Sequence, residues 1–143
     1  MWKKPNNLCI LDLVTHPPKR FFMTKLILTV DDSKVTLMMI ERHLSELDPQ
    51  WQVIKAENGD QALEAAASHQ IDAFTVDYNM PGMNGIEVIT KLRESYPDKK
   101  IVLLTSNIQS NVQQQADELN VRVFNKPVLR ELVEEIVKYF NEN

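Results

Sequence analysis

The chain has 143 residues, of which 43% are hydrophobic and 25% are charged, and its formal net charge is −4. These values are ordinary for a globular protein, and the length suits one domain with a single core. They exclude a disordered, collagen-like, coiled-coil or disulfide-rich chain, and no apolar run approaches the roughly 20 residues that span a bilayer.

Residues 1–22 differ from the rest of the chain. They hold four basic residues against Asp12 alone, so the remainder carries a net charge of −7. Their apolar run is too short for a signal peptide, contains that aspartate and is followed by Pro17-Pro18. We expect residues 1–22 to be an N-terminal extension, poorly ordered or due to a mis-assigned start, and 23–143 to form the domain. Its acidity argues against direct nucleic-acid binding.

The domain alternates short aliphatic runs with patterns of helical period. The five predicted strands are Leu26–Val30, Trp51–Ala56, Ile71–Val76, Ile101–Thr105 and Val121–Phe124. The five predicted helices are Lys34–Leu47, Gln61–His69, Gly85–Ser95, Gln109–Leu119 and Val128–Asn141. Several strands are continuously apolar, as expected of strands buried on both faces of a parallel sheet. The alternation predicts an α/β fold, a doubly wound (βα)5 sandwich around a five-stranded parallel sheet.

Local sequence signals define the first and last of these helices. Ser33 is placed to cap the first helix, and Asp48-Pro49 ends it. In the last helix, an apolar stripe of helical period should face the core. Its members are Leu129, Leu132, Val133, Ile136, Val137 and Phe140.

Polar side chains follow four of the predicted strands, at the edge where doubly wound sheets bind ligands. Asp31 and Asp32 follow the first strand, and Asp77 follows the third. The fourth strand ends at Thr105, and Lys126 follows the fifth. We therefore expect three carboxylates, a hydroxyl and an ammonium group to converge at one edge of the sheet.

This convergence suits phosphoryl chemistry. Carboxylates held close together raise one another's pKa unless a cation neutralises them, and an all-oxygen site of this size suits Mg²⁺. A carboxylate beside that metal can attack phosphorus and form an acyl phosphate, with Lys126 and Thr105 supplying donors to the phosphoryl oxygens. Taken singly, each residue has a simpler interpretation, such as helix capping by Asp31 and Asp32. Their joint occurrence at successive strand ends favours the functional interpretation.

Four segments carry a resemblance to a known family: Val30–Ser33, Val76–Gly85, Leu104–Ser106 and Phe124–Pro127. The pattern D-x-x-M-P-x-x-x-G in the second segment is highly specific. On these segments the chain, from about Lys25 onward, resembles the receiver domains of two-component response regulators, and the stand-alone chemotaxis type in particular. The resemblance implies a flavodoxin-like strand order of 2-1-3-4-5.

The resemblance also implies a role for each carboxylate. Asp77 corresponds to the phosphoacceptor. Asp32 and Asp77, with the backbone carbonyl of Asn79, correspond to the Mg²⁺ ligands of the family, and Asp31 is expected to act through a metal-bound water. The cofactor implied is therefore Mg²⁺.

The remaining site residues follow from the same resemblance. Thr105 resembles the switch hydroxyl that moves toward the phosphoryl group, and Lys126 resembles the lysine that pairs with it. Phe124 occupies the position of an aromatic switch residue. The Lys126–Pro127 peptide bond is expected to be cis.

The sequence departs from the family pattern before the fifth strand, where the usual Gly-Ala pair is Asn120-Val121. Asparagine is the next best residue after glycine for a left-handed helix C-terminus. We expect Val121 to add bulk beside the site and to alter how the fourth helix moves.

The resemblance implies a single-domain regulator phosphorylated by a histidine kinase or histidine phosphotransfer protein, and no enzyme beyond its own phosphorylation and dephosphorylation. Phosphorylation should switch the binding of an unknown downstream protein to the face formed by the fourth helix, fifth strand and fifth helix. We expect a monomer or a weak phosphorylation-dependent dimer without membrane insertion. The lone Cys9 suits a reducing, cytoplasmic location.

Three other functions fit the sequence less well. An aspartate-nucleophile phosphatase requires an acid/base aspartate two residues beyond the nucleophile, where this chain has Asn79. A flavin-binding electron carrier requires a phosphate loop after the first strand, where Asp31 and Asp32 would repel a phosphate. A receiver-like scaffold without phosphorylation is disfavoured because the acidic residues, Thr105 and Lys126 are all intact.

Overall fold

The computed structural model describes residues 24–142, so the predicted extension 1–22 lies outside the described residues. Five parallel strands form one sheet in the order β2-β1-β3-β4-β5. They are β1 (Lys25–Val30), β2 (Trp51–Ala56), β3 (Ala73–Asp77), β4 (Lys100–Thr105) and β5 (Arg122–Asn125). The helices are α3 (Lys34–Leu47), α4 (Gly59–Ser68), α5 (Gly85–Ser95), α6 (Ser110–Glu118) and α7 (Arg130–Asn141). The predicted doubly wound α/β fold and its strand order are confirmed.

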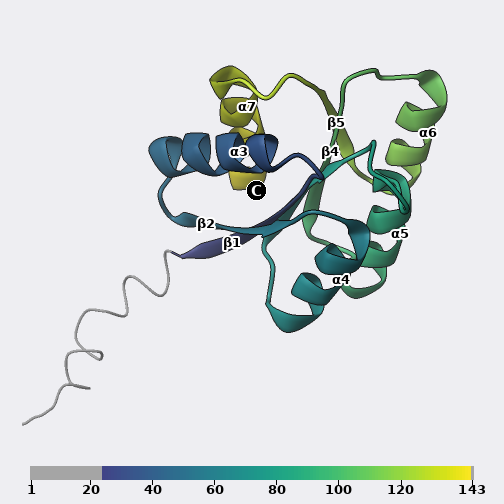
Figure 1. Cartoon of the computed structure of the whole chain (residues 1–143), viewed down its shortest axis with the longest axis horizontal. Helices are drawn as coiled ribbons and strands as arrows, with labels where there is room; N and C mark the ends of the chain where they lie inside the picture. The colour runs from purple at the N-terminus through teal and green to yellow at the C-terminus, as the bar shows by residue number, and fades with distance from the viewer. Residues whose placement is uncertain (1–23, 143) are drawn as a thin grey trace, which may run out of the picture.

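Helices cover both faces of the sheet, with α3 and α7 on one face and α4, α5 and α6 on the other (Figure 1). Successive residues of a strand point to opposite faces. Ile27 and Val102 therefore join the core under α3 and α7, whereas Leu28 and Leu103 join the core under the other helices. This two-sided burial explains the continuous apolar runs of the strands. Within the described residues, no helix has the length and apolarity that crossing a membrane requires.

The strand register brings the carboxyl ends of the strands to one level. Val30 is paired with Val76, so the residues that follow them, Asp31 and Asp77, emerge side by side. Thr105 is paired with Asn125, so Lys126 emerges beside the end of β4. The predicted convergence of polar side chains thus follows directly from the pairing of the strands.

Three predicted elements, α3, α5 and β2, have the observed bounds, whereas others begin at a different residue. Strand β3 begins at Ala73 instead of Ile71, because the carboxylate of Asp72 accepts the Leu26 N–H at 2.8 Å in place of a backbone carbonyl. Helix α4 begins at Gly59 because Asn58 caps it by accepting the Gln61 N–H.

The start of α7 also differs from the prediction. The Lys126–Pro127 peptide bond is cis, as predicted, and the helix begins at Arg130. Leu129 is the N-cap residue and is 53% exposed, so its assignment to the buried stripe was wrong. The stripe that does face the core consists of Val133, Ile136, Val137 and Phe140, with Leu132 partly buried.

Asn120 has the left-handed conformation predicted for it, with φ of 56°. Its N–H donates to Asp117 O and the Val121 N–H donates to Ala116 O, the two bonds of a Schellman turn that ends α6. Val121 was expected beside the site, and this was wrong. It precedes β5 and is buried in the core at the amino end of that strand, opposite the edge that carries the carboxylates.

Candidate functional site

Asp77 is fixed by the strand that it ends and by the loop that follows. Every residue of β3 is buried, and Asp77 itself is only 4% exposed. Met80 packs into the core and so fixes the loop between β3 and α5 against it. The Gly85 N–H donates to Tyr78 O at 2.9 Å. A Cβ at Gly85 would lie 2.5 Å from Asp77 O and 2.8 Å from a Leu103 methyl. The methionine and the glycine of the D-x-x-M-P-x-x-x-G pattern therefore let α5 begin in contact with the backbone of Asp77.

Asp31 and Asp32 follow β1 and have different environments. Asp31 is 1% exposed, and its Oδ1 accepts the Ser33 N–H at 2.9 Å. Asp32 is exposed. The α3 cap is the hydroxyl of Ser33, as predicted, which accepts the Thr36 N–H at 3.2 Å. Because Ser33 caps the helix, capping does not account for the two aspartates.

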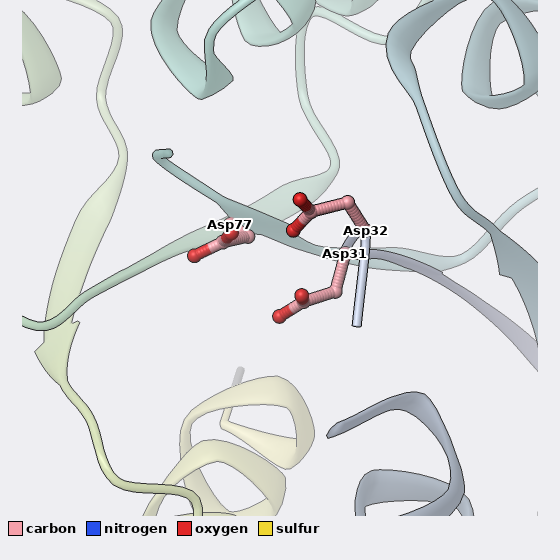
Figure 2. A group of neighbouring side chains, drawn as sticks. All are labelled: Asp31, Asp32 and Asp77. Atoms are coloured by element: carbon pink, nitrogen blue, oxygen red, sulfur yellow. The ribbon is translucent and has the colours of Figure 1, made fainter. Parts of the chain in front are cut away.

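The three carboxylates face a common space at the ends of β1 and β3 (Figure 2). One oxygen from each of Asp31, Asp32 and Asp77 lies within 4.8 Å of the others. Lys126 reaches this space from the end of β5, with Nζ 2.9 Å from Asp31 Oδ2 and 3.0 Å from Asp77 Oδ1. The structure thus brings together four of the predicted site residues.

Burial controls the ionisation of the pocket. Desolvation raises the pKa of Asp77 from 3.8 to about 6, and the charges of Asp31 and Asp32 add to this rise while the hydrogen bond from Lys126 opposes it. Burial lowers the pKa of Lys126, but the hydrogen bonds to Asp31 and Asp77 and the negative charges of these two residues together outweigh burial and leave that pKa raised. At neutral pH the pocket therefore holds an ionised, unusually basic aspartate beside a protonated lysine.

The other predicted site residues flank this cluster. Thr105 is 1% exposed, and its hydroxyl exchanges hydrogen bonds of 3.3 Å with the backbone of Asn107. Phe124 is 6% exposed and packs in the core beside α7, with the Arg122 guanidinium 5.1 Å from its ring centroid. Asn79 is exposed, two residues beyond Asp77.

Two features of the site were not predicted. Lys126 was assigned to the phosphoryl group alone, whereas here it bridges two acids. Exposed apolar residues also lie beside the site: Met39 of α3 shares a groove with Leu129 and Lys126, and Val35 and Met38 are exposed on the same helix. The α3 residues had a sequence signal, because one helix face cannot bury apolar residues at 35, 38 and 39 together with Leu37 and Ile40.

Comparison with known proteins assigns a family. The family model of the response regulator receiver domain matches residues 27–138. The chain is 37% identical over 87 residues to the nitrate/nitrite response regulator NarL of Escherichia coli, covering 60% of this chain and 40% of NarL. It is 32% identical over 108 residues to a cyclic di-GMP phosphodiesterase of Thermotoga maritima, covering 75% of this chain and 28% of that protein. The matched part is thus less than half of either relative.

Solved structures of similar proteins agree with the fold and the family. The chemotaxis protein CheY4 of Vibrio cholerae has a TM-score of 0.76 at 25% identity, covering 82% of this chain and 98% of that one. The response regulator TrrA of Thermotoga maritima, in complex with Mg²⁺ and beryllium fluoride, has a TM-score of 0.71 at 29% identity, covering 82% and 99%. From the family match and the shared fold, the chain belongs to the response regulator receiver domains of two-component signalling systems.

Proposed function

We propose that this chain is a phosphorylation-dependent switch, in which Asp77 accepts a phosphoryl group from a histidine kinase or a histidine phosphotransfer protein. One observation carries the proposal: the buried Asp77 is bridged by Lys126 to Asp31, with the Asp32 carboxylate beside them. A buried acid pair with a single ammonium group suits a site where negative charge is added and removed. Phosphorylation and Mg²⁺ binding are general properties of the receiver-domain family.

The proposed Mg²⁺ ligands are Asp32, Asp77 and the backbone carbonyl of Asn79, and Asp31 would act through a water. The donors present fit a hard cation, since all are oxygens and three carboxylates share one space. Both oxygens of Asp31 already have partners, the Ser33 N–H and Lys126, which supports its indirect role. When bound, Mg²⁺ would neutralise the carboxylates and the incoming phosphoryl oxygens.

The proposed transfer uses Asp77 as a nucleophile. A carboxylate oxygen of Asp77 attacks phosphorus, the P–N bond of the donor phosphohistidine breaks, and the imidazole leaves with its bonding electrons and takes up a proton. The raised pKa of Asp77 favours this step, because the carboxylate is ionised at pH 7 and more basic than an ordinary aspartate. Hydrolysis of the acyl phosphate restores the aspartate, so catalysis is limited to the chain's own phosphorylation and dephosphorylation.

Two side chains can form hydrogen bonds to the phosphoryl group once it is attached to Asp77. Lys126 already lies 3.0 Å from Asp77 Oδ1, so it can transfer its hydrogen bond to a phosphoryl oxygen with little movement. The Thr105 hydroxyl donates to Asn107 O and accepts the Asn107 N–H, both at 3.3 Å, and a charged phosphoryl oxygen can replace Asn107 O as its acceptor. We propose that this exchange moves the loop before α6.

The exposed apolar residues beside the site favour a protein as the donor of the phosphoryl group. Val35, Met38, Met39 and Leu129 are 36% to 65% exposed. A groove of about 440 Å³ beside them is lined by Met39, Leu129, Lys126, Pro127, Val128, Thr36 and Ser106. A helical donor protein could cover this surface and present a phosphohistidine to Asp77, because Lys126 lines both the groove and the pocket.

The face formed by α6, β5 and α7 is the proposed output surface. A groove of about 380 Å³ runs across it, lined in part by Gln113, Arg122 and Tyr139. The Arg122 guanidinium lies 5.1 Å from the Phe124 ring and 5.0 Å from the Tyr139 ring. A change of Phe124 rotamer would therefore move Arg122 on the surface, which links the pocket to a partner protein or domain. We place this switch in the cytoplasm.

The experiment is incubation of the chain with acetyl phosphate and Mg²⁺, followed by intact-mass spectrometry. The proposal predicts one phosphoryl increment that hydroxylamine removes, that EDTA prevents and that Asp77→Asn lacks. An increment that survives hydroxylamine, or that persists in Asp77→Asn, would overturn the proposal.

A further inference from the structure

Helix α5 lies between α4 and α6 (Figure 1). Two side chains from its C-terminal end, Arg93 and Tyr96, bond to the ends of these neighbours. Arg93 donates through Nε to Leu119 O and through Nη2 to Asn120 O, both at 2.9 Å. Its Nη1 donates to Tyr96 O at 3.0 Å and to Lys99 O at 2.6 Å. One guanidinium thus joins the C-terminus of α6 to the C-terminus of α5.

The chemistry of this contact favours a fixed geometry. The planar guanidinium donates from three nitrogens to backbone carbonyls, and no ion pair involves Arg93 among residues 24–142. Carbonyls at a helix C-terminus lack helical partners and carry partial negative charge, so a cation stabilises them. The Schellman turn at Asn120 adds two backbone bonds at the same place. The C-terminal end of α6 is therefore held by both side-chain and backbone bonds.

The opposite end of α6 is held much less firmly. Its N-cap residue, Gln109, makes no side-chain capping bond, and the preceding Ile108 is 41% exposed. The helix buries only Val112 and Ala116. The loop that leads into this end starts at Thr105, whose hydroxyl is held by long bonds. The weak end of α6 is thus the end nearest the carboxylates.

We propose that Arg93 is a positioning residue that fixes the C-terminal end of α6, so that phosphorylation tilts the helix about this end. With its C-terminal end fixed, α6 can follow a loop displacement at Thr105 only at its other end, residues 108–113, which border the α6–β5–α7 face. Arg93 touches none of the reacting atoms. This inference rests on the proposed phosphorylation of Asp77, but the fixed end can be tested without it.

Hydrogen exchange of the unphosphorylated chain tests the fixed end. In Arg93→Met, the amides of Asn120 and Val121 should exchange about tenfold faster, because several bonds to a charged group are lost. Arg93→Lys keeps a cation but has fewer donors, so the exchange rates of these two amides should lie between those of Arg93→Met and those of the wild type. Tyr96→Phe is the matched control from the same helix end, where the tyrosine hydroxyl lies 2.6 Å from Ala66 O and 2.8 Å from His69 O. It should speed exchange at Ile71, whose N–H donates to the tyrosine hydroxyl at 3.4 Å, and leave α6 unchanged.

The same variants with Mg²⁺ and beryllium fluoride test the tilt. In the wild type, the phosphoryl mimic should change exchange over residues 106–113 and leave Asn120 and Val121 unaltered. In Arg93→Met the change should extend through the whole of α6, while phosphorylation of Asp77 by acetyl phosphate stays within about twofold of the wild type.

Either of two results would overturn the inference: Arg93→Met exchanging like the wild type in both states, or Tyr96→Phe altering α6 as much as Arg93→Met does. Failure of the wild type to take up a phosphoryl group would overturn the proposed function instead. In that case the exchange of Asn120 and Val121 in the unphosphorylated variants still decides whether Arg93 fixes the end of α6.

Discussion

Asp77 is the residue where stability and function oppose each other. Its pKa is raised from 3.8 to about 6 mainly because burial removes water from the carboxylate, so at pH 7 the folded protein holds a charge that the unfolded chain holds at lower cost. Asp77→Asn removes that charge and should raise the free energy of unfolding of the metal-free protein by about 2 kcal/mol at pH 7. Urea unfolding in EDTA measures this, with the exposed Asp32→Asn as the smaller-effect control. A loss of stability in Asp77→Asn would contradict the account.

The pH dependence of stability has a definite sign. Between pH 4 and 6 the native state binds more protons at Asp77 than the unfolded state does, because the folded pKa is the higher one. The contribution of this group to the free energy of unfolding therefore falls as pH rises through that window. The amount by which the free energy of unfolding of Asp77→Asn exceeds that of the wild type should be near zero at pH 4 and should reach its full value above pH 6. A stability difference between the two proteins that is the same at pH 4 and pH 7 would show that the raised pKa of Asp77 is not its cause.

Metal affinity should respond to the same carboxylate. Below about pH 6 a proton must leave Asp77 before a cation binds, so the Mg²⁺ association constant should fall about tenfold per pH unit. Calorimetric titration from pH 5 to 8 measures this. The weaker binding expected for Asp77→Asn should lack that dependence between pH 5 and 7, and a flat wild-type profile would argue against Asp77 as a ligand.

At the scale of elements, Gly85 sets the distance between α5 and Asp77. A methyl group there would meet Asp77 O at 2.5 Å, so Gly85→Ala should lower the free energy of unfolding by about 2 kcal/mol and slow phosphorylation. Gly82→Ala is the control. Its Cβ would meet nothing within 4 Å and only its φ of 83° is strained, so it should cost about 1 kcal/mol and leave phosphorylation unchanged. Equal effects of the two variants on phosphorylation would contradict this role of Gly85.

The elements that the sequence predicts best are those whose ends are set by local chemistry. Helix α3 has the predicted bounds because Ser33 caps it and Asp48-Pro49 stops it. Strand β3 was placed two residues early because the Asp72 side chain replaces a backbone partner, which only the neighbouring strand reveals. Convergence of the carboxylates could be predicted, because parallel strands end at one edge. The bridging position of Lys126 could not, since it depends on side-chain reach in the folded state.

At the scale of the whole molecule, long-range bonds from side chains to the ends of helices gather at the edge opposite the carboxylates. Arg93, Tyr96 and Lys100 each bond to carbonyls at the C-terminal end of a neighbouring helix. No sequence pattern identifies those acceptors, because each lies about 26 to 42 positions away along the chain. Three helix ends are therefore fixed at this edge, whereas at the other edge the Thr105 side chain holds the loop from β4 to α6 only through bonds of 3.3 Å.

A substitution of Lys100 tests whether the edge opposite the carboxylates contributes to stability without affecting phosphorylation. The Lys100 ammonium lies 2.7 Å from Tyr139 O and 2.5 Å from Glu142 O and so holds the end of α7. Lys100→Met should lower the free energy of unfolding by about 1 kcal/mol and leave the phosphorylation of Asp77 unchanged. The exposed Lys99→Met, whose nearest carboxylate is 4.0 Å away, should change stability by less than about 0.5 kcal/mol. A phosphorylation defect in Lys100→Met would contradict the separation of the two edges.

The central claim is that the phosphoryl group is carried by Asp77, and locating the modified residue tests it most directly. Borohydride reduces an aspartyl phosphate to homoserine, and tandem mass spectrometry of the digested protein then identifies the position. After treatment with acetyl phosphate and Mg²⁺, the account predicts homoserine at position 77 and none at 31 or 32. Homoserine at another position, or none in a sample whose intact mass shows phosphorylation, would contradict it.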